Sequence, residues 1–188
     1  MARPHTVQPA GVALHVIQRA RGACFSGDAD RIGYLRRLRG HAQRVECAIH
    51  AYALMGNHVH LLLTPARPDG AGSLMDALRE PPGVRWEEGF DASPVHARQY
   101  LFACMRYIES NPQRARLVAR PGGYRWSSYR ANAMGRVDAL VTPHPLYYAL
   151  GRTPGLRQAA YRALFLREGA VPARAVYAGR ALLNRVGG

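Results

Sequence analysis

The middle of the sequence holds two apolar segments joined by a short turn. Residues 45–55 (VECAIHAYALM) alternate as a strand does, and Gly56-Asn57 favours a turn. The HVHLLL stretch that begins at His58 is typical of a returning strand. The pattern predicts a β-hairpin over residues 45–63, and therefore a fold that contains an antiparallel sheet.

Periodicity elsewhere predicts one more strand and a series of helices around this hairpin. A strand is expected at 12–19, helices at 30–44 (capped by Asp28 or Asp30), at 72–79, from Ser93-Pro94 to Asn111-Pro112 and near 154–168, and a loop over 80–94. The order strand–helix–strand–strand–helix–helix favours an α+β fold. We expect a ferredoxin-like antiparallel sheet with helices on one face, followed by a C-terminal helical extension.

Length and composition fit one globular domain with a short appendage. The chain has 188 residues, 48% of them hydrophobic and 20% charged, which is too apolar for an intrinsically disordered protein. Its three cysteines, Cys24, Cys47 and Cys104, form no CxxC pair, which argues for a reducing compartment. The sequence has neither a signal-like segment nor a run of about 18 apolar residues. We therefore expect a soluble cytoplasmic protein with no membrane partner.

The charge is strongly positive and is carried by arginine alone. There are 26 basic and 12 acidic residues, for a formal net charge of +14, and none of the basic residues is lysine. Guanidinium groups make bidentate contacts with phosphate and stack on bases, so the charge favours a nucleic-acid partner. Codon bias in a GC-rich genome also explains an arginine-only composition, and a basic surface also suits other acidic partners.

Two histidines at the start of the returning strand form a candidate metal site. His58 and His60 are separated by one residue, so their side chains share one face of the strand. The residues expected on the opposite, apolar face are Val59, Leu61 and Leu63. Two neighbouring imidazoles can share a divalent cation with a third ligand from another element, and a pair of ordinary strand histidines is the alternative.

Motifs of other enzyme classes do not match this pair. His-x-His occurs once and runs into leucine, which argues against a two-histidine phosphoesterase. The sequence also lacks His-Glu-x-x-His and Gly-x-Ser-x-Gly, the signatures of zinc proteases and serine hydrolases.

The expected helix after residue 94 carries a tyrosine and an amide on one side. Its apolar stripe consists of Leu101, Met105 and Ile108. Tyr107 and Asn111 lie one turn apart at the border of this stripe, where a phenol can reach a site while its ring rests on the core. Tyr100 shares this side of the helix and is an alternative candidate, and a purely structural role for Tyr107 is another.

Several motifs occur together in an order that resembles the single-tyrosine HUH transposases, in particular the REP-associated tyrosine transposases. The matching segments are HAYALMGNHVHLLLTP, YLFACMRYIESNPQRARLV and GGYRWSSYRA. His58-Val59-His60 corresponds to the family's His-hydrophobic-His motif, and Tyr107 with Asn111 to its catalytic tyrosine and metal-binding amide. The matching N-terminal features are MARP, His15-Val16, Arg19 and the acidic helix start at Asp28-Ala29-Asp30.

This resemblance implies a fold, a reaction and a partner. The family fold is a ferredoxin-like α+β domain, here residues 1–135, and residues 136–188 would be a partly helical C-terminal extension. The implied ligands of Mg²⁺ or Mn²⁺ are His58, His60 and Asn111. Tyr107 would attack single-stranded or hairpin DNA and form a 5′-phosphotyrosine and a free 3′-hydroxyl. The resemblance further implies a bacterial, nucleoid-associated protein that acts in DNA transposition or repetitive-element mobilisation, as a monomer or a homodimer.

One departure from the family leaves a second function open. Family members carry a basic, aromatic helix before the tyrosine helix, and the corresponding stretch around 80–94 is shortened here. The second hypothesis is therefore a catalytically impaired or domesticated relative that still binds nucleic acid.

The expected nucleic-acid contacts are arginines and one tryptophan. The segment RWSSYR at 125–130 interleaves guanidinium groups with rings, as in proteins that stack unpaired bases, although the rings also suit packing of the loop on the core. The candidates are Arg19, Arg21, Arg106, Arg114, Arg125, Trp126 and Arg130.

Overall fold

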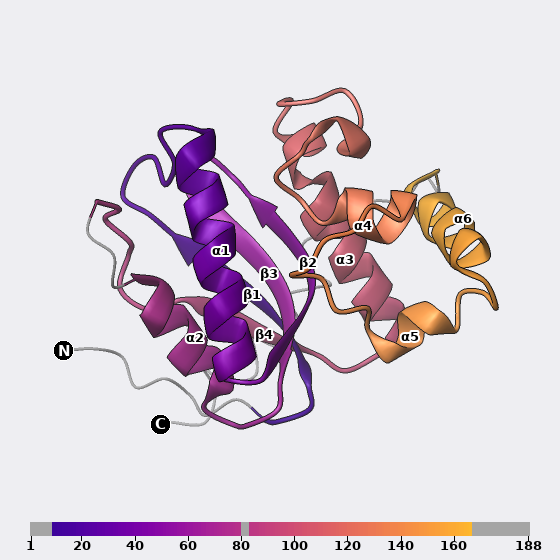
Figure 1. The fold of residues 1–188 in the computed structure, drawn as a ribbon, viewed down its shortest axis with the longest axis horizontal. Helices are drawn as coiled ribbons and strands as arrows, with labels where there is room; N and C mark the ends of the chain where they lie inside the picture. The colour runs from indigo at the N-terminus through magenta and orange to yellow at the C-terminus, as the bar shows by residue number, and fades with distance from the viewer. Residues whose placement is uncertain (1–8, 80–82, 167–188) are drawn as a thin grey trace, which may run out of the picture.

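The computed structural model of the protein describes residues 9–79 and 83–166. This part of the chain contains a four-stranded sheet, six α-helices and one short 3-10 helix (Figure 1). The elements are β1 (Ala13–Arg19), α1 (Asp28–Arg44), β2 (Cys47–Leu54), β3 (His58–Pro65), α2 (Gly70–Arg79), β4 (Asp91–Val95), α3 (Arg98–Arg114), η1 (Pro121–Gly123), α4 (Tyr129–Met134), α5 (Pro145–Tyr148) and α6 (Pro154–Leu166).

The sheet has a ferredoxin-like topology. Its strand order is β2-β3-β1-β4, and every neighbouring pair is antiparallel. With α1 and α2 between the strands, β1 to β4 form a βαββαβ unit. In the register of β1 and β3, Arg19 lies opposite His58 and Leu14 lies opposite Leu63. The predicted α+β class, hairpin and antiparallel sheet are confirmed.

Helices α1 and α2 cover one face of the sheet (Figure 1), and an apolar core lies between these helices and the strands. Val59, Leu61 and Leu63 of β3 are fully buried in it, as the alternation in the sequence predicts. Leu38 of α1 and Leu74 of α2 belong to the same buried cluster. Burial of one such side chain contributes roughly 1.5–3 kcal/mol, so this layer supplies much of the fold's stability.

The opposite face is covered by α3, so the helices do not all lie on one face as expected. Figure 1 shows α1 and α2 on one side of the sheet and α3 to α6 on the other. The predicted stripe of Leu101, Met105 and Ile108 is buried there with Leu62 of β3 and Ala53 of β2. Because the second face of β2 and β3 is itself largely apolar, one layer of helices cannot bury both faces.

The stretch expected to be a loop before α3 contains the fourth strand. In β4, Ser93 lies opposite His15 and Pro94 opposite Leu14 of β1. The expectation that Ser93-Pro94 opens a helix is therefore wrong, and α3 begins at Arg98. Proline lacks a backbone N–H but is tolerated on an edge strand. Strand β4 has only five residues and is partly exposed, so its sequence shows little alternation of polar and apolar residues.

The prediction that Asp28 or Asp30 caps the first helix is wrong, because α1 already begins at Asp28. Its N-cap position is Gly27, and Asp28 and Asp30 occupy the first turn. The Asp30 carboxylate accepts a hydrogen bond from the Ser26 N–H at 2.7 Å. Acidic groups also interact favourably with the positive end of the helix dipole, so these aspartates stabilise the terminus from inside the helix.

Helix α3 passes through the Asn-Pro pair that was expected to end it. Asn111 and Pro112 are helical, and the helix continues to Arg114. The Ala115 N–H then donates to the Asn111 carbonyl at 2.8 Å. Pro112 lacks the N–H that would bond to the Ile108 carbonyl, but the helix continues for two residues after it. Asn111 therefore keeps a helical position one turn after Tyr107.

The chain after α3 returns along the free edge of β2. Ser127 forms a bridge with Ala53, and Val141 forms one with Ile49, so the edge of the sheet is covered rather than left open. Beyond this segment, α4 and α6 pack against each other beside α3 (Figure 1).

The C-terminal helix expected near 154–168 is present as α6 up to Leu166, and residues 167 and 168 lie outside the described part. The division into residues 1–135 and 136–188 stays a prediction. Among residues 9–79 and 83–166, no helix combines the length and the apolar character needed to cross a membrane.

Candidate active site

Three elements bring the predicted site residues together on the second face of the sheet. Strand β3 carries His58 and His60, and the adjacent β1 carries His15. Helix α3 covers this face and presents Tyr107 and Asn111 from successive turns. Because strand residues alternate between faces, the two histidines of β3 point away from the apolar core of α1 and α2 and towards α3.

His60 is at the centre of the cluster. Its Nε2 lies 3.1 Å from Nδ2 of Asn111, and its Nδ1 lies 3.1 Å from Nε2 of His15. The His58 ring stands edge-on to the His60 ring, with centroids 4.8 Å apart. His15 and His60 are buried, whereas His58 and Asn111 are partly exposed and form the solvent-facing side of the cluster.

The ring of Tyr107 packs against both buried histidines. Its centroid lies 5.7 Å from that of His60 and 5.8 Å from that of His15, edge-on in both cases. The Arg114 guanidinium lies over the Tyr107 ring at 5.1 Å. Tyr100, the alternative candidate two turns earlier, is 41% exposed. The structure therefore gathers Tyr107, and not Tyr100, with the histidines.

Asn57, in the turn before β3, contacts the ring of His58. Its Oδ1 lies 2.7 Å from Nδ1 of His58. With the amide oxygen facing the ring in this way, the matching neutral tautomer has its proton on Nδ1 and its lone pair on Nε2. The turn residue therefore orients His58 in the way that outer partners orient metal-binding imidazoles.

Burial keeps the imidazoles of the cluster neutral. It lowers the pKa of His15 from 6.5 to about 4. Burial also lowers the pKa of His60 well below its usual value, and the neighbouring His15, His58 and Arg19 add to this effect. The pKa of His58 is lowered by burial and by Arg19, which lies opposite it in the sheet. Neutral imidazoles have the lone pairs that a metal ion requires.

The donor set suits a divalent cation. Two neutral imidazoles of β3 and an amide of α3 lie in contact with one another, and nitrogen and amide-oxygen donors are both found among the ligands of divalent ions. Within the described residues, no group of three or more His, Cys, Asp and Glu side chains is arranged to hold a metal ion. A cation bound here would therefore depend on Asn111 as its third protein ligand.

The predicted nucleic-acid contacts fall into two groups. Arg19 and Arg114 lie at the cluster, opposite His58 and over Tyr107 respectively, and Arg21 is exposed just beyond β1. The other arginines make contacts within the protein. These contacts are Arg106 Nη1 to the Leu164 carbonyl (2.8 Å), Arg130 Nε to the Gly122 carbonyl (2.9 Å) and Arg125 Nη1 to the Asp28 carboxylate (3.2 Å).

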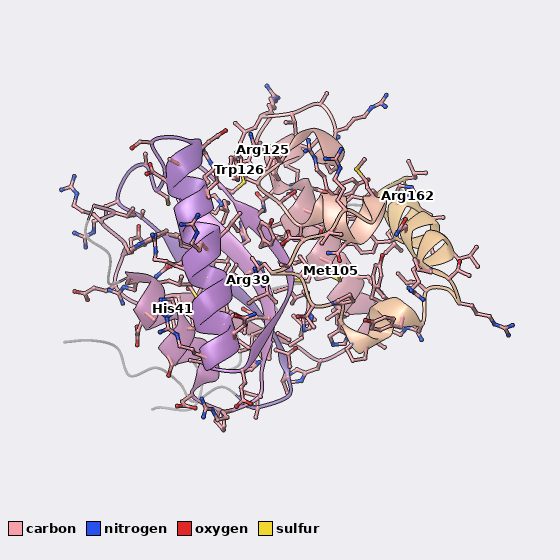
Figure 2. The ribbon with its side chains drawn as sticks, viewed as in Figure 1. Arg39, His41, Met105, Arg125, Trp126 and Arg162 are labelled. Atoms are coloured by element: carbon pink, nitrogen blue, oxygen red, sulfur yellow. The ribbon has the colours of Figure 1, made fainter. Side chains whose placement is uncertain are left out.

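Trp126 is buried and fills a structural position. Only 8% of the residue is exposed, and the Arg125 guanidinium lies over its ring at 4.5 Å (Figure 2). The Arg31 guanidinium of α1 lies 5.7 Å from the same ring. This geometry favours packing of the loop on the core over stacking of Trp126 on bases.

Glu109 is a buried group that sequence reasoning missed. It lies on α3 between Tyr107 and Asn111, and burial raises its pKa to about 7 while its three hydrogen bonds oppose that rise. The donors to its carboxylate are Ser128 Oγ (2.6 Å), Asn132 Nδ2 (2.8 Å) and Tyr161 Oη (2.8 Å). Glu109 lies four residues after Met105, on the buried apolar stripe of α3. An acidic residue on such a stripe indicates a buried carboxyl group that needs hydrogen-bond partners.

Comparisons with known proteins bear on the fold. No protein-family model matches the sequence, and no curated protein matches it. Among solved structures, the chain is similar to a REP-associated tyrosine transposase bound to a REP hairpin. The TM-score is 0.60 at 14% identity, over 77% of this chain and 93% of that chain. At this identity the likeness shows a shared fold, and it agrees with the α+β class predicted from the sequence.

Proposed function

We propose that this protein is a transposase-like strand transferase that cleaves and rejoins single-stranded or hairpin DNA. The observation that carries the proposal is the meeting of an imidazole, an amide and a phenol. Asn111 lies within hydrogen-bond distance of His60, and Tyr107 packs against the same ring. His60 and Asn111 are 51 positions apart in the chain, so only the fold unites them.

Charge and the structural neighbour support DNA as the partner. The chain has a formal net charge of +14, and the guanidinium of Arg114 stacks on the proposed nucleophile while Arg19 lies opposite His58. The neighbour was solved with a hairpin bound. Arginine pairs well with phosphate oxygens, so we expect these two side chains to contact the backbone around the cleaved bond.

In the proposed reaction Tyr107 is the nucleophile. A bond forms between its Oη and phosphorus, and the bond from phosphorus to the 3′ oxygen breaks. The phenol releases one proton and the departing 3′ oxygen takes one up. A phenol is far more acidic than an aliphatic alcohol, so it also leaves readily when a 3′-hydroxyl attacks in the reverse direction. The phosphodiester energy is conserved and rejoining needs no ATP.

The other residues of the cluster bind and orient. We assign His58, His60 and Asn111 as ligands of Mg²⁺ or Mn²⁺, which when bound stabilises the charge that develops on the phosphate. His58 and His60 contribute neutral nitrogens. Imidazole ligands favour Mn²⁺ over Mg²⁺, because Mg²⁺ strongly prefers oxygen.

A covalent adduct tests this function. The protein is incubated with a 3′-labelled hairpin oligonucleotide and Mn²⁺, and the products are separated on a denaturing gel. We expect a labelled protein–DNA species that Tyr107→Phe abolishes. Tyr100→Phe, the same change at the exposed tyrosine of α3, is the matched control and should retain the adduct.

Two results would contradict the proposal. An adduct that persists in Tyr107→Phe excludes this nucleophile. Wild-type protein that binds the hairpin with a steep salt dependence, but forms no adduct, is a nucleic-acid-binding protein instead of a strand transferase.

A further inference from the structure

We propose that His15 is a positioning residue that determines which ring nitrogen of His60 carries the proton. By holding the proton on Nδ1, it leaves the lone pair of the His60 ring on Nε2, the nitrogen that faces Asn111. Its importance for catalysis rests on the proposed function, whereas the hydrogen-bond chain itself can be tested without any reaction.

The direction of the chain follows from the donors and acceptors. Nδ2 of Asn111 lies 3.1 Å from Nε2 of His60. With the Asn111 NH₂ group facing the ring, as the structure places it, this ring nitrogen is the acceptor and carries no proton. The proton of the neutral His60 ring is then on Nδ1. That nitrogen lies 3.1 Å from Nε2 of His15, which accepts the second hydrogen bond.

The structure holds His15 rigidly in this role. His15 is only 1% exposed, and its ring lies nearly parallel to that of His60, with centroids 5.3 Å apart and an interplanar angle of 23°. Tyr107 packs edge-on against it from α3. In the register of β1 and β3, His15 lies opposite Leu62, which makes it the diagonal neighbour of His60 on the same face.

Packing alone does not account for a polar side chain at position 15 of β1. The residues two places before and after it, Ala13 and Ile17, are buried and apolar. An imidazole between them costs free energy unless its nitrogens are bonded. The bond to His60 meets that requirement for Nε2. Loss of the hydrogen-bond partner of a metal-binding histidine lowers metal affinity or activity by about 10–100-fold.

The first test needs only the wild-type protein. Long-range ¹H–¹⁵N spectra of the histidine rings report which nitrogen of His60 is protonated. We expect the proton on Nδ1 in the metal-free protein. A His60 ring protonated on Nε2 would overturn the inference, whatever the variants do.

The second test compares three variants by Mn²⁺ titration and by the same spectra. His15→Phe keeps a ring but removes the acceptor, and should mix the His60 tautomers and weaken Mn²⁺ binding about 10–100-fold. His15→Gln restores an acceptor and should recover most of the affinity.

His50→Phe is the matched control, because His50 is another buried histidine of a strand. The two nitrogens of His50 are bonded to Thr142 and Thr64. This control should leave the His60 tautomer and Mn²⁺ affinity unchanged.

The outcomes separate this inference from the proposed function. If His15→Phe binds Mn²⁺ as tightly as wild type and His60 stays protonated on Nδ1, or if His50→Phe weakens binding equally, the positioning role is wrong. If the tautomer and affinity change as expected but wild-type protein never forms a DNA adduct, His15 positions His60 and the strand-transfer proposal fails.

Discussion

The two faces of the central sheet are built from alternate residues of the same strands, yet they differ in chemistry. Towards α1 and α2, β3 presents Val59, Leu61 and Leu63, all fully buried. Towards α3, the same strand presents His58 and His60, and β1 adds His15. The first face supplies stability through apolar burial, and the second supplies bonded polar groups.

This difference shows how a small domain can carry a polar site without losing its core. A strand with a period of two separates the two tasks residue by residue. On the second face the polar cluster occupies one region, where β1, β3 and the last turns of α3 meet, while Leu62, Met105 and Ile108 keep the remainder apolar. Substitutions on the two faces should therefore have separable effects.

The largest effect is expected from removal of a histidine on the second face. His60→Ala deletes a proposed ligand together with its bonds to Asn111 and His15. A bound cation supplies several kcal/mol of charge stabilisation, so adduct formation should fall on the order of 1,000-fold. Single-turnover rates with the labelled hairpin measure this loss, and a decrease of less than about tenfold would mean that His60 is not a ligand.

Leu61→Ala, one residue further along β3, is the matched change on the first face. Because Leu61 is fully buried, the free energy of unfolding should fall by about 2–5 kcal/mol. The rate of adduct formation should stay within about threefold of wild type at temperatures where the variant is folded. A comparable loss of activity in both variants would remove the distinction between the faces.

A further prediction concerns acid stability, which the buried His50 of β2 should reduce. Burial lowers the pKa of His50 from 6.5 to about 4, with the adjacent His144 adding to this and the bond to Thr142 opposing it. The unfolded chain therefore binds more protons than the folded chain between these two values. Stability should fall as pH drops from 6.5 towards 4, and His50 should add no pH dependence above that window.

Urea unfolding at pH 7 and pH 4 measures this contribution, which is about 3 kcal/mol for a shift of this size. In His50→Gln the fall in stability between the two pH values should be smaller than in wild type by that amount. Parallel losses in the two proteins would show that His50 is not held neutral by the fold.

The smallest effect is expected at the edge of the site. Arg114→Ala removes the guanidinium over the Tyr107 ring, a contact worth about 0.5–1 kcal/mol at an exposed position, together with the expected phosphate contact. Adduct formation should therefore slow by at least two- to fivefold. Arg98→Ala, an exposed arginine at the other end of α3, changes the net charge equally. Equal slowing in both variants would point to overall charge rather than to the ring contact.

The sequence predicted the parts of the fold that depend on local patterns. The Gly56-Asn57 turn and the alternation after it predicted the hairpin, and the spacing of Leu101, Met105 and Ile108 predicted the buried side of α3. The same periodicities placed Tyr107 and Asn111 beside one another and directed both histidines to one face. These relations need only the geometry of one helix or one strand.

The remaining features depend on contacts between distant segments. Strand β4 forms because β1 offers an open edge to Ser93 and Pro94, and no local pattern reveals that edge. The pairing of His15 with His60 spans 45 positions, and the bonds of Glu109 reach the helices that follow α3. Such partners become visible only when the sheet and its two layers of helices are assembled.

The most direct measurement of the central idea is the identity of the residue that becomes linked to DNA. Wild-type protein is reacted with the hairpin and Mn²⁺, digested, and analysed by tandem mass spectrometry for a nucleotide-modified peptide. We predict that the modification lies on Tyr107, beside His60 and Asn111. Modification of Tyr100 or of any tyrosine on another element would contradict the assignment of this cluster as the active site.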